Sequence, residues 1–235
     1  MQVTFRGKRP EAYNIYTFEW EPTETFSFTA GQFMKMLLPH PNADERGEMH
    51  FFTISASPTE TYLANTTKFS QPSSTFKQTL RVLEPGARVE ITGPYGEFVL
   101  PPDEKQPLVF VAGGIGVTPY RSILKYLVDT NQTRPIQLLY AANQPQELAF
   151  RELFDHLPRP IAITYMVSQS NESWSGAVGQ LSGAKIQELA GGLDGKLVYL
   201  SGPKPMVQAF KDQLLELGIN EAKIMTDYFP GYTKI

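Results

Sequence analysis

The chain has 235 residues, of which 41% are hydrophobic, a formal net charge of -3 at pH 7 and no cysteine. This length suits one large domain or two of ordinary size, and the mild acidity argues against nucleic acid as a main partner and against a polybasic membrane anchor. The lack of cysteine excludes disulfides, thiolate nucleophiles and cysteine-ligated clusters, and the three histidines are scattered, so redox chemistry here needs a bound organic cofactor.

Residues 1–13 lack the apolar core of a signal peptide, and no stretch of the sequence approaches transmembrane length. Together these features predict a cytoplasmic protein with no membrane segment.

The first hundred residues have the pattern of an all-β unit. Short strands are expected at residues 13–21, 32–38, 49–54, 62–69 and 88–92. A polar loop at 40–48 separates two of them, and a short helix is expected at 73–80, where three hydroxyl residues precede its apolar positions. Short strands with regular turn signals predict a small closed antiparallel barrel.

The pattern changes after residues 101–105, which are polar and contain two prolines. We therefore expect two domains, at 1–102 and 103–235. In the second, strands are expected at 108–112, 136–142, 161–167, 196–201 and 223–228, and helices at 119–128, 146–156, 181–189 and 205–217. The alternation of strands and helices predicts a doubly wound parallel α/β sheet.

The most informative stretch is residues 108–126. A continuous apolar run leads into a turn that contains Gly113, Gly114 and Gly116, with Thr118 placed as a helix N-cap and Pro119 as the first helical residue. A strand, glycine turn and helix in this order direct free backbone N–H groups at a phosphate, although such turns also occur where helix and strand simply pack closely. The common dinucleotide fingerprint is not met, because Pro119 occupies the third glycine position and no acidic residue follows strand 136–142.

Four stretches together carry a resemblance to a known family. They are His50-Phe51-Phe52-Thr53, then Ser73-Ser74-Thr75, then the turn at 93–98, and finally residues 113–119 combined with Ser201-Gly202-Pro203-Lys204-Pro205-Met206. In this order, and spread over nearly the whole chain, they resemble the ferredoxin–NADP reductase superfamily of flavoproteins. The resemblance implies a Greek-key β-barrel that binds FAD, followed by a doubly wound domain that binds a nicotinamide dinucleotide.

For the flavin, the resemblance implies contacts from the barrel. The residues concerned are His50, Phe51, Phe52, Thr53, Thr67, Lys68, Ser73, Ser74 and Thr75. Thr53 has the catalytic role of a hydroxyl beside the reactive flavin nitrogen, while the serines, Thr75 and Lys68 are expected near the phosphates. Taken one by one, the same residues also fit ordinary strand and N-cap positions. FMN in place of FAD stays open.

Two positions depart from the flavin motif. His50 stands where the family has an arginine that contacts a flavin phosphate, and a histidine cannot make the same permanent bidentate contact. Phe52 replaces a tyrosine and so lacks its hydroxyl. The missing arginine makes the neighbouring phosphate donors more necessary.

For the nicotinamide dinucleotide, the resemblance implies contacts from the second domain. The residues concerned are Gly113, Gly114, Gly116, Thr118, Pro119, Ser201, Gly202, Pro203 and Met206. Ser201 stands where the family usually has a cysteine beside the nicotinamide, and we assign it a catalytic role. An aromatic residue near the chain end often covers the flavin, and Tyr232 is the first candidate and Phe229 the second. A loosely ordered tail is the alternative.

The resemblance implies a ferredoxin reductase-like oxidoreductase. It takes hydride from NAD(P)H to bound FAD and passes electrons to a separate acceptor, which is a ferredoxin-like or haem protein or a small oxidant. NADH is slightly favoured, because no cation follows strand 136–142 to meet a 2′-phosphate. The alternatives are a flavin reductase that releases reduced flavin and a non-catalytic subunit that retains only the fold. The acceptor, the oligomeric state and the direction of electron flow stay open.

Overall fold

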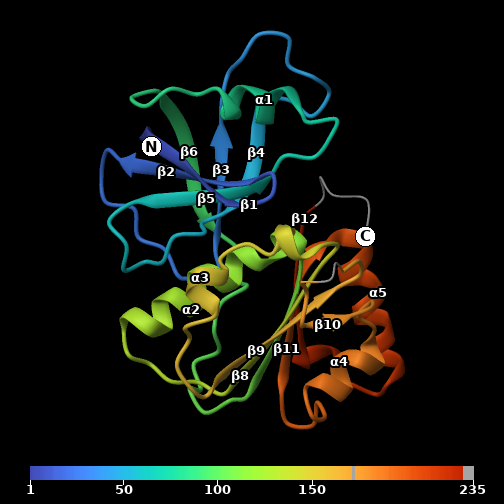
Figure 1. The fold of residues 1–235 in the computed structure, drawn as a ribbon. Helices are drawn as coiled ribbons and strands as arrows, with labels where there is room; N and C mark the ends of the chain where they lie inside the picture. The colour runs from blue at the N-terminus through green and yellow to red at the C-terminus, as the bar shows by residue number, and fades with distance from the viewer. Residues whose placement is uncertain (171–172, 230–235) are drawn as a thin grey trace.

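The computed structural model describes residues 1–170 and 173–229 as two sheets, one above the other in Figure 1. Strands β1 to β6 form the upper sheet and strands β7 to β12 the lower one. The upper sheet ends at Tyr95 and the lower begins at Leu108, so residues 96–107 connect them. The domain boundary that we expect at residues 102–103 lies within this connection.

The upper sheet is antiparallel. Its elements are β1 (Gln2–Ala12), β2 (Ile15–Pro22), β3 (Phe33–Leu37), β4 (Met49–Thr53), β5 (Leu63–Lys68), α1 (Thr75–Arg81) and β6 (Arg88–Tyr95). The strand order is β4-β3-β6-β1-β2-β5. No ladder joins β4 to β5 in the described chain, so the expected barrel is present but is not closed by hydrogen bonds, and both edge strands remain free to border a site.

Strand β1 is the longest strand and was not expected. Its first residues alternate well, with Val3 and Phe5 buried, but residues 6–12 include Arg6, Lys8, Arg9 and Glu11 around Pro10. A polar run with a proline has no strand signal of its own. The structure forms β1 there because β2 pairs along nearly its whole length, from Val3 opposite Pro22 to Ala12 opposite Ile15.

The barrel core forms from alternate residues of these strands. Phe18 and Trp20 on β2 and Met34 and Met36 on β3 have no exposed surface, and Phe76 of α1 closes the core from one side. This period of two is what an antiparallel sheet with one buried face requires.

The lower sheet is parallel throughout, with the order β10-β9-β8-β7-β11-β12. Its strands are β7 (Leu108–Gly113), β8 (Ile136–Ala142), β9 (Ile161–Val167), β10 (Ala177–Val178), β11 (Leu197–Pro203) and β12 (Ile224–Phe229). Its helices are α2 (Thr118–Asp129), α3 (Arg151–Phe154), α4 (Gly183–Leu189) and α5 (Lys204–Glu216), with 3-10 turns η1 (Gly114–Val117), η2 (Pro145–Glu147) and η3 (Glu221–Lys223). The predicted doubly wound fold is confirmed, although α3 is much shorter than the helix expected at 146–156 and the two-residue β10 was not expected.

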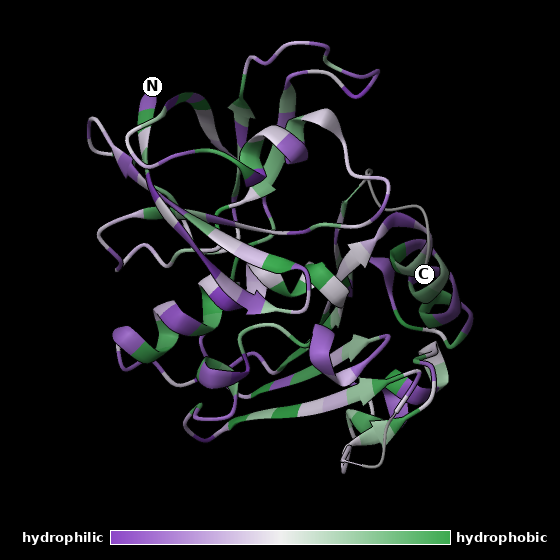
Figure 2. Ribbon diagram, turned by 45° about the horizontal axis from the view of Figure 1, so that its top comes forward, coloured by the Kyte–Doolittle hydropathy of each residue, from purple (hydrophilic) through white to green (hydrophobic). Residues whose placement is uncertain are grey.

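Helices cover both faces of this sheet, and β7 is therefore buried on both faces. Phe110 of β7 packs in one core with Tyr120 and Leu124 of α2, whereas Val111 packs in a second core with Phe210 of α5. Figure 2 shows hydrophobic and hydrophilic residues on both α2 and α5, as helices with one buried side require. Among the described residues, no helix is long and apolar enough to cross a membrane.

The start of α2 differs from the expectation. Val117 is the N-cap, and Thr118 is already helical, with its hydroxyl donating to the Ile115 carbonyl at 3.1 Å. The glycine turn forms the 3-10 helix η1, which runs directly into α2, so no residue between them needs a capping side chain. Pro119 lies in the first turn, as expected.

Candidate functional site

A cavity of about 690 Å³ lies where the barrel meets the parallel sheet. Both edge strands of the barrel, β4 and β5, border it, together with residues 70–77. The other wall comes from the turn after β7 and from the end of β12, which points toward the barrel in Figure 1. The volume is typical of a site for a small organic molecule.

Most of the residues that we expected at the flavin line this cavity. They are His50, Phe51, Phe52, Thr53, Thr67, Ser73, Ser74 and Phe229, and Thr118 joins them from the expected nicotinamide set. Thr53 is 4% exposed, so its hydroxyl is held in a nearly dry wall of the site. The hydroxyls and rings predicted from separate stretches are therefore brought together.

Two expected phosphate contacts lie elsewhere. Thr75 does not line the cavity, because its hydroxyl accepts from the Asp44 backbone N–H at 3.0 Å and contacts His40 Nε2 at 2.9 Å. Lys68 forms an ion pair with Glu147 of the parallel-sheet domain at 2.8 Å, which draws its ammonium away from the cavity lining. Tyr232 lies outside the described residues.

The two parts of the expected nicotinamide site meet at Gly116. A Cβ built on Gly116 would lie 2.3 Å from the Ser201 carbonyl oxygen and 2.5 Å from the Gly202 Cα. A Cβ on Gly113 would lie 2.2 Å from the Met206 sulfur. Gly116 has to be glycine because the turn after β7 is packed directly on the backbone at the end of β11, whereas at Gly113 the atoms in the way belong to the flexible end of the Met206 side chain on α5.

This contact lies at the topological switch point of the sheet. From β7 the chain winds through β8 and β9 to one side, whereas β11 and β12 lie on the other. Ligands of open α/β sheets bind at the carboxyl ends of the strands where the winding reverses. Gly113 ends β7 and Ser201 lies near the end of β11, so the expected dinucleotide residues occupy this point.

Asp227 is a site residue that the sequence reasoning missed. It lies on β12 opposite Ser201 of β11 and lines the cavity. Burial raises the pKa of Asp227 to about 6, and the nearby Ser201 hydroxyl lowers it by less. The Ser201 hydroxyl is fully buried and makes no hydrogen bond of standard geometry with a described residue. The only signal available in the sequence was a carboxylate two positions before Phe229.

Comparison with known proteins agrees with this geometry. Residues 110–212 match a protein-family model described as the oxidoreductase NAD-binding domain. The chain is 25% identical over 239 residues to the reductase subunit of stachydrine N-demethylase from Rhizobium meliloti, covering 97% of this chain and 67% of that longer protein. It is 28% identical over 213 residues to ferredoxin–NADP reductase B of Sorangium cellulosum, covering 86% of each.

A solved structure extends the likeness to the whole fold. The flavohem-like FAD/NAD binding domain of nitric oxide dioxygenase from Vibrio cholerae superposes with a TM-score of 0.83 at 21% identity, covering 97% of this chain and 98% of that domain. In sequence and fold the chain is similar to the ferredoxin–NADP reductase superfamily, and it contains an oxidoreductase NAD-binding domain.

The cavity of this reductase fits a flavin nucleotide. Phe51, Phe52 and Phe229 provide apolar surface for a planar ring, and Ser74 and Lys77 provide polar groups for phosphates. The Ser73 hydroxyl, which we expected at the phosphates, instead donates to the Ser70 carbonyl at 2.7 Å. His50 Nε2 is buried without a hydrogen-bond partner among the described residues, so one donor or acceptor of the wall is left for a ligand.

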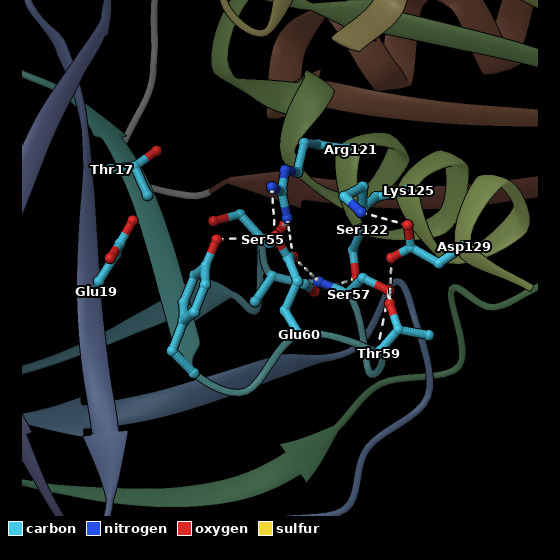
Figure 3. A network of polar contacts seen from close by, with 12 residues as sticks. Thr17, Glu19, Ser55, Ser57, Thr59, Glu60, Arg121, Ser122, Lys125 and Asp129 are labelled. Atoms are coloured by element: carbon cyan, nitrogen blue, oxygen red, sulfur yellow. Dashed lines mark hydrogen bonds and ion pairs between the residues drawn. The ribbon is translucent and has the colours of Figure 1, made fainter. Parts of the chain in front are cut away.

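The two domains of the reductase are joined by the polar network in Figure 3. Arg121 of α2 donates both terminal nitrogens to the Glu60 carboxylate of the barrel and also reaches the Ser55 carbonyl at 2.9 Å. Ser122 donates to the Ala56 carbonyl at 2.6 Å, and Thr59 donates to Asp129. We call these contacts between residues 55–60 and α2 the interdomain network. They link the loop after β4 to the helix that begins at Thr118.

The described residues hold no group of three or more His, Asp or Glu side chains that could bind a metal ion.

Proposed function

We propose that this chain is the reductase of an electron-transfer pair: it oxidises NADH and supplies electrons to a separate acceptor. The observation that carries the proposal is the cavity between the domains, which Thr53 borders from one side and Thr118, Asp227 and Phe229 border from the other. A nicotinamide ring and a flavin ring have to meet between two such walls. Bound FAD would supply the chemistry, accepting hydride and releasing electrons singly.

Within this proposal, the chain's own residues bind and orient. Thr53 presents a buried hydroxyl to the flavin side, and Ser201 presents one beside the dinucleotide turn. Gly116 lets the turn pack on the end of β11, and Gly114, where a Cβ would meet open space, leaves room for the dinucleotide to approach the turn. Asp227 holds or releases a proton near neutral pH at the wall that Phe229 also forms.

The preference for NADH rests on the chain after β8. Asn143 and Gln144 lie there, and both interact with residues after β9: the Gln169 N–H donates to the Asn143 carbonyl at 2.8 Å, and Gln144 Nε2 to Gln169 Oε1 at 3.2 Å. The nearest arginine, Arg151, pairs with Asp155 at 2.9 Å and lies over the Tyr165 ring at 5.0 Å. Amides suit ribose hydroxyls, whereas a 2′-phosphate calls for a cation.

A separate acceptor follows from the composition. These 235 residues contain no cysteine, so a cysteine-ligated iron–sulfur centre has to be supplied from outside them. The stachydrine demethylase relative is itself named as a reductase subunit. We therefore propose a ferredoxin-like or haem protein as the partner, with a small oxidant as the alternative.

The test is the visible spectrum of the purified protein before and after anaerobic addition of NADH, then NADPH. We expect a flavin spectrum that NADH bleaches faster. Flavin that is lost on gel filtration would instead favour a flavin reductase that releases its product. A protein that stays colourless after incubation with FAD would favour a subunit that has kept only the fold.

A further inference from the structure

His50 occupies the position of the family's phosphate-binding arginine but cannot supply its charge. The ring stacks on Phe76 of α1 with centroids 4.1 Å apart. Burial lowers the pKa of His50, and the charges of Lys77 and Arg46 lower it further. The imidazole is therefore neutral at pH 7, and two cations lie close enough to affect it.

Those two cations, Arg46 and Lys77, both line the cavity on the barrel side. Among the described lining residues they are the only arginine and lysine. The one carboxylate in the lining, Asp227, comes from β12 in the other domain. The positive charge of the site is thus gathered where the barrel binds the polar part of its ligand.

Arg46 is held in place by the loop that precedes β4. Asp44 accepts the Thr75 backbone N–H at 3.0 Å, and its own N–H donates to the Thr75 hydroxyl at 3.0 Å, which fastens the loop to α1. Arg46 Nε and Nη2 then donate to the same Asp44 carboxylate, at 3.1 and 2.6 Å. This geometry leaves Nη1 without a hydrogen bond to a described residue and available to a ligand.

Lys77 approaches from the other side, on α1. Its ammonium donates to the Lys68 carbonyl at 2.9 Å, which fixes its position near the end of β5. Because Lys77 also lines the cavity, its positive charge can act on an anion that is bound there.

We propose that Arg46 and Lys77 bind the phosphate groups of the flavin nucleotide, in place of the arginine that His50 replaces. This inference rests on the proposed use of a flavin. The two cations offset the negative charge of the phosphates, and the buried, unpartnered His50 Nε2 is left to make a neutral hydrogen bond.

The experiment titrates the flavin-free full chain with riboflavin, FMN and FAD and follows the quenching of flavin fluorescence. The variants are Arg46→Gln, Lys77→Met and His50→Arg. Arg88→Gln is the matched control, because Arg88 is an exposed cation of the same domain, on β6, and does not line the cavity. Riboflavin, which has no phosphate, separates charge recognition from damage to the ring site.

We expect Arg46→Gln and Lys77→Met each to weaken FMN and FAD binding about tenfold and to leave riboflavin unchanged, as loss of one charge-assisted contact predicts. Added salt should weaken FAD binding less in these variants than in the wild type. His50→Arg should tighten FAD binding. In the His50→Arg background, Lys77→Met should weaken FAD binding less than threefold.

Unchanged FAD binding in both single variants would overturn the inference, and so would an equal loss of riboflavin and FAD. A penalty for Lys77→Met that is undiminished beside His50→Arg would also overturn it, since the cations would then not replace the arginine. A wild-type chain that binds none of the three flavins would refute the proposed function itself.

Discussion

Arg121 donates hydrogen bonds from both terminal nitrogens of its guanidinium to the Glu60 carboxylate of the barrel. Arg121 lies on α2, the helix that follows the glycine turn after β7. Both side chains are nearly buried, at 9% and 12% exposure. Glu60 also accepts the Ser57 N–H at 2.6 Å and the Tyr62 hydroxyl at 2.8 Å, so its lone pairs are well used. This pair joins the loop after β4 to α2, the helix whose first residue, Thr118, lines the cavity.

Removing one partner of this pair should be costly. Glu60→Gln or Arg121→Met should each lower the free energy of unfolding by about 3 kcal/mol, because each leaves an uncompensated buried group. The double variant should cost clearly less than the sum, as measured by urea unfolding. Lys125→Met, which breaks only a surface ion pair with Asp129, is the control and should cost under about 1 kcal/mol. If the loss of stability in the double variant equals the sum of the two single losses, Glu60 and Arg121 are not energetically coupled.

The same pair gives a pH dependence with a definite sign. Burial raises the pKa of Glu60, but the hydrogen bond and charge of Arg121 lower it more, so the net pKa falls below the usual 4.5. The stabilisation is complete above about pH 4.5 and is lost as pH falls through the lower pKa of the folded state. The stability difference between wild type and Glu60→Gln should therefore shrink in acid, when unfolding is measured at about pH 6 and about pH 3.

Asp227 should show the opposite trend. Its raised pKa of about 6 means that the ionised form is disfavoured in the folded protein, so stability falls as pH rises from about 4 to about 6. Asp227→Asn should thus stabilise the protein at pH 8, by at most about 3 kcal/mol, and much less at pH 5. An inflection near pH 6 in the rate of NADH oxidation should disappear in the same variant. An unchanged inflection would assign it to another group.

Gly116 should tolerate no side chain. In Gly116→Ala the new Cβ would overlap the Ser201 carbonyl and the Gly202 Cα, so the turn and β11 must separate. We expect a loss of about 2 kcal/mol in stability and at least tenfold weaker NADH binding, with FAD retained, measured by calorimetry and flavin absorbance. Ser201→Ala is the control, because it keeps the backbone and removes a buried hydroxyl that has no standard hydrogen bond, and it should fold as well as the wild type.

The choice between NADH and NADPH should depend on the segment after β8. Gln144→Arg places a cation beside Asn143, where a 2′-phosphate would lie, and should raise kcat/KM for NADPH about tenfold. Gln144→Glu, of similar size, should lower it. If both variants keep the wild-type ratio of the two donors, the ribose is bound elsewhere.

The sequence by itself determined the elements and the family. Predominantly apolar runs marked the parallel strands, because strands covered on both faces bury most of their side chains, and β7, β8 and β9 lie where these runs predict them. The glycine turn and the Ser201–Met206 stretch were recognisable because their backbone requirements limit the residues allowed. β1 was missed because its polar half becomes a strand only through pairing with β2.

The tertiary structure decided which of these residues meet. Gly116 lies against Ser201, which is 85 positions later in the sequence, and Asp227 acquires a shifted pKa only because β12 is placed next to β11. The sequence pattern does not indicate the roles of Arg46, Lys77 and the Arg121–Glu60 pair. In a sequence, a charged residue is expected to be solvated, and only folding removes its water and supplies its partner. Local pattern reports what a segment can form, whereas burial, charge pairing and site chemistry depend on neighbours that only the folded chain brings together.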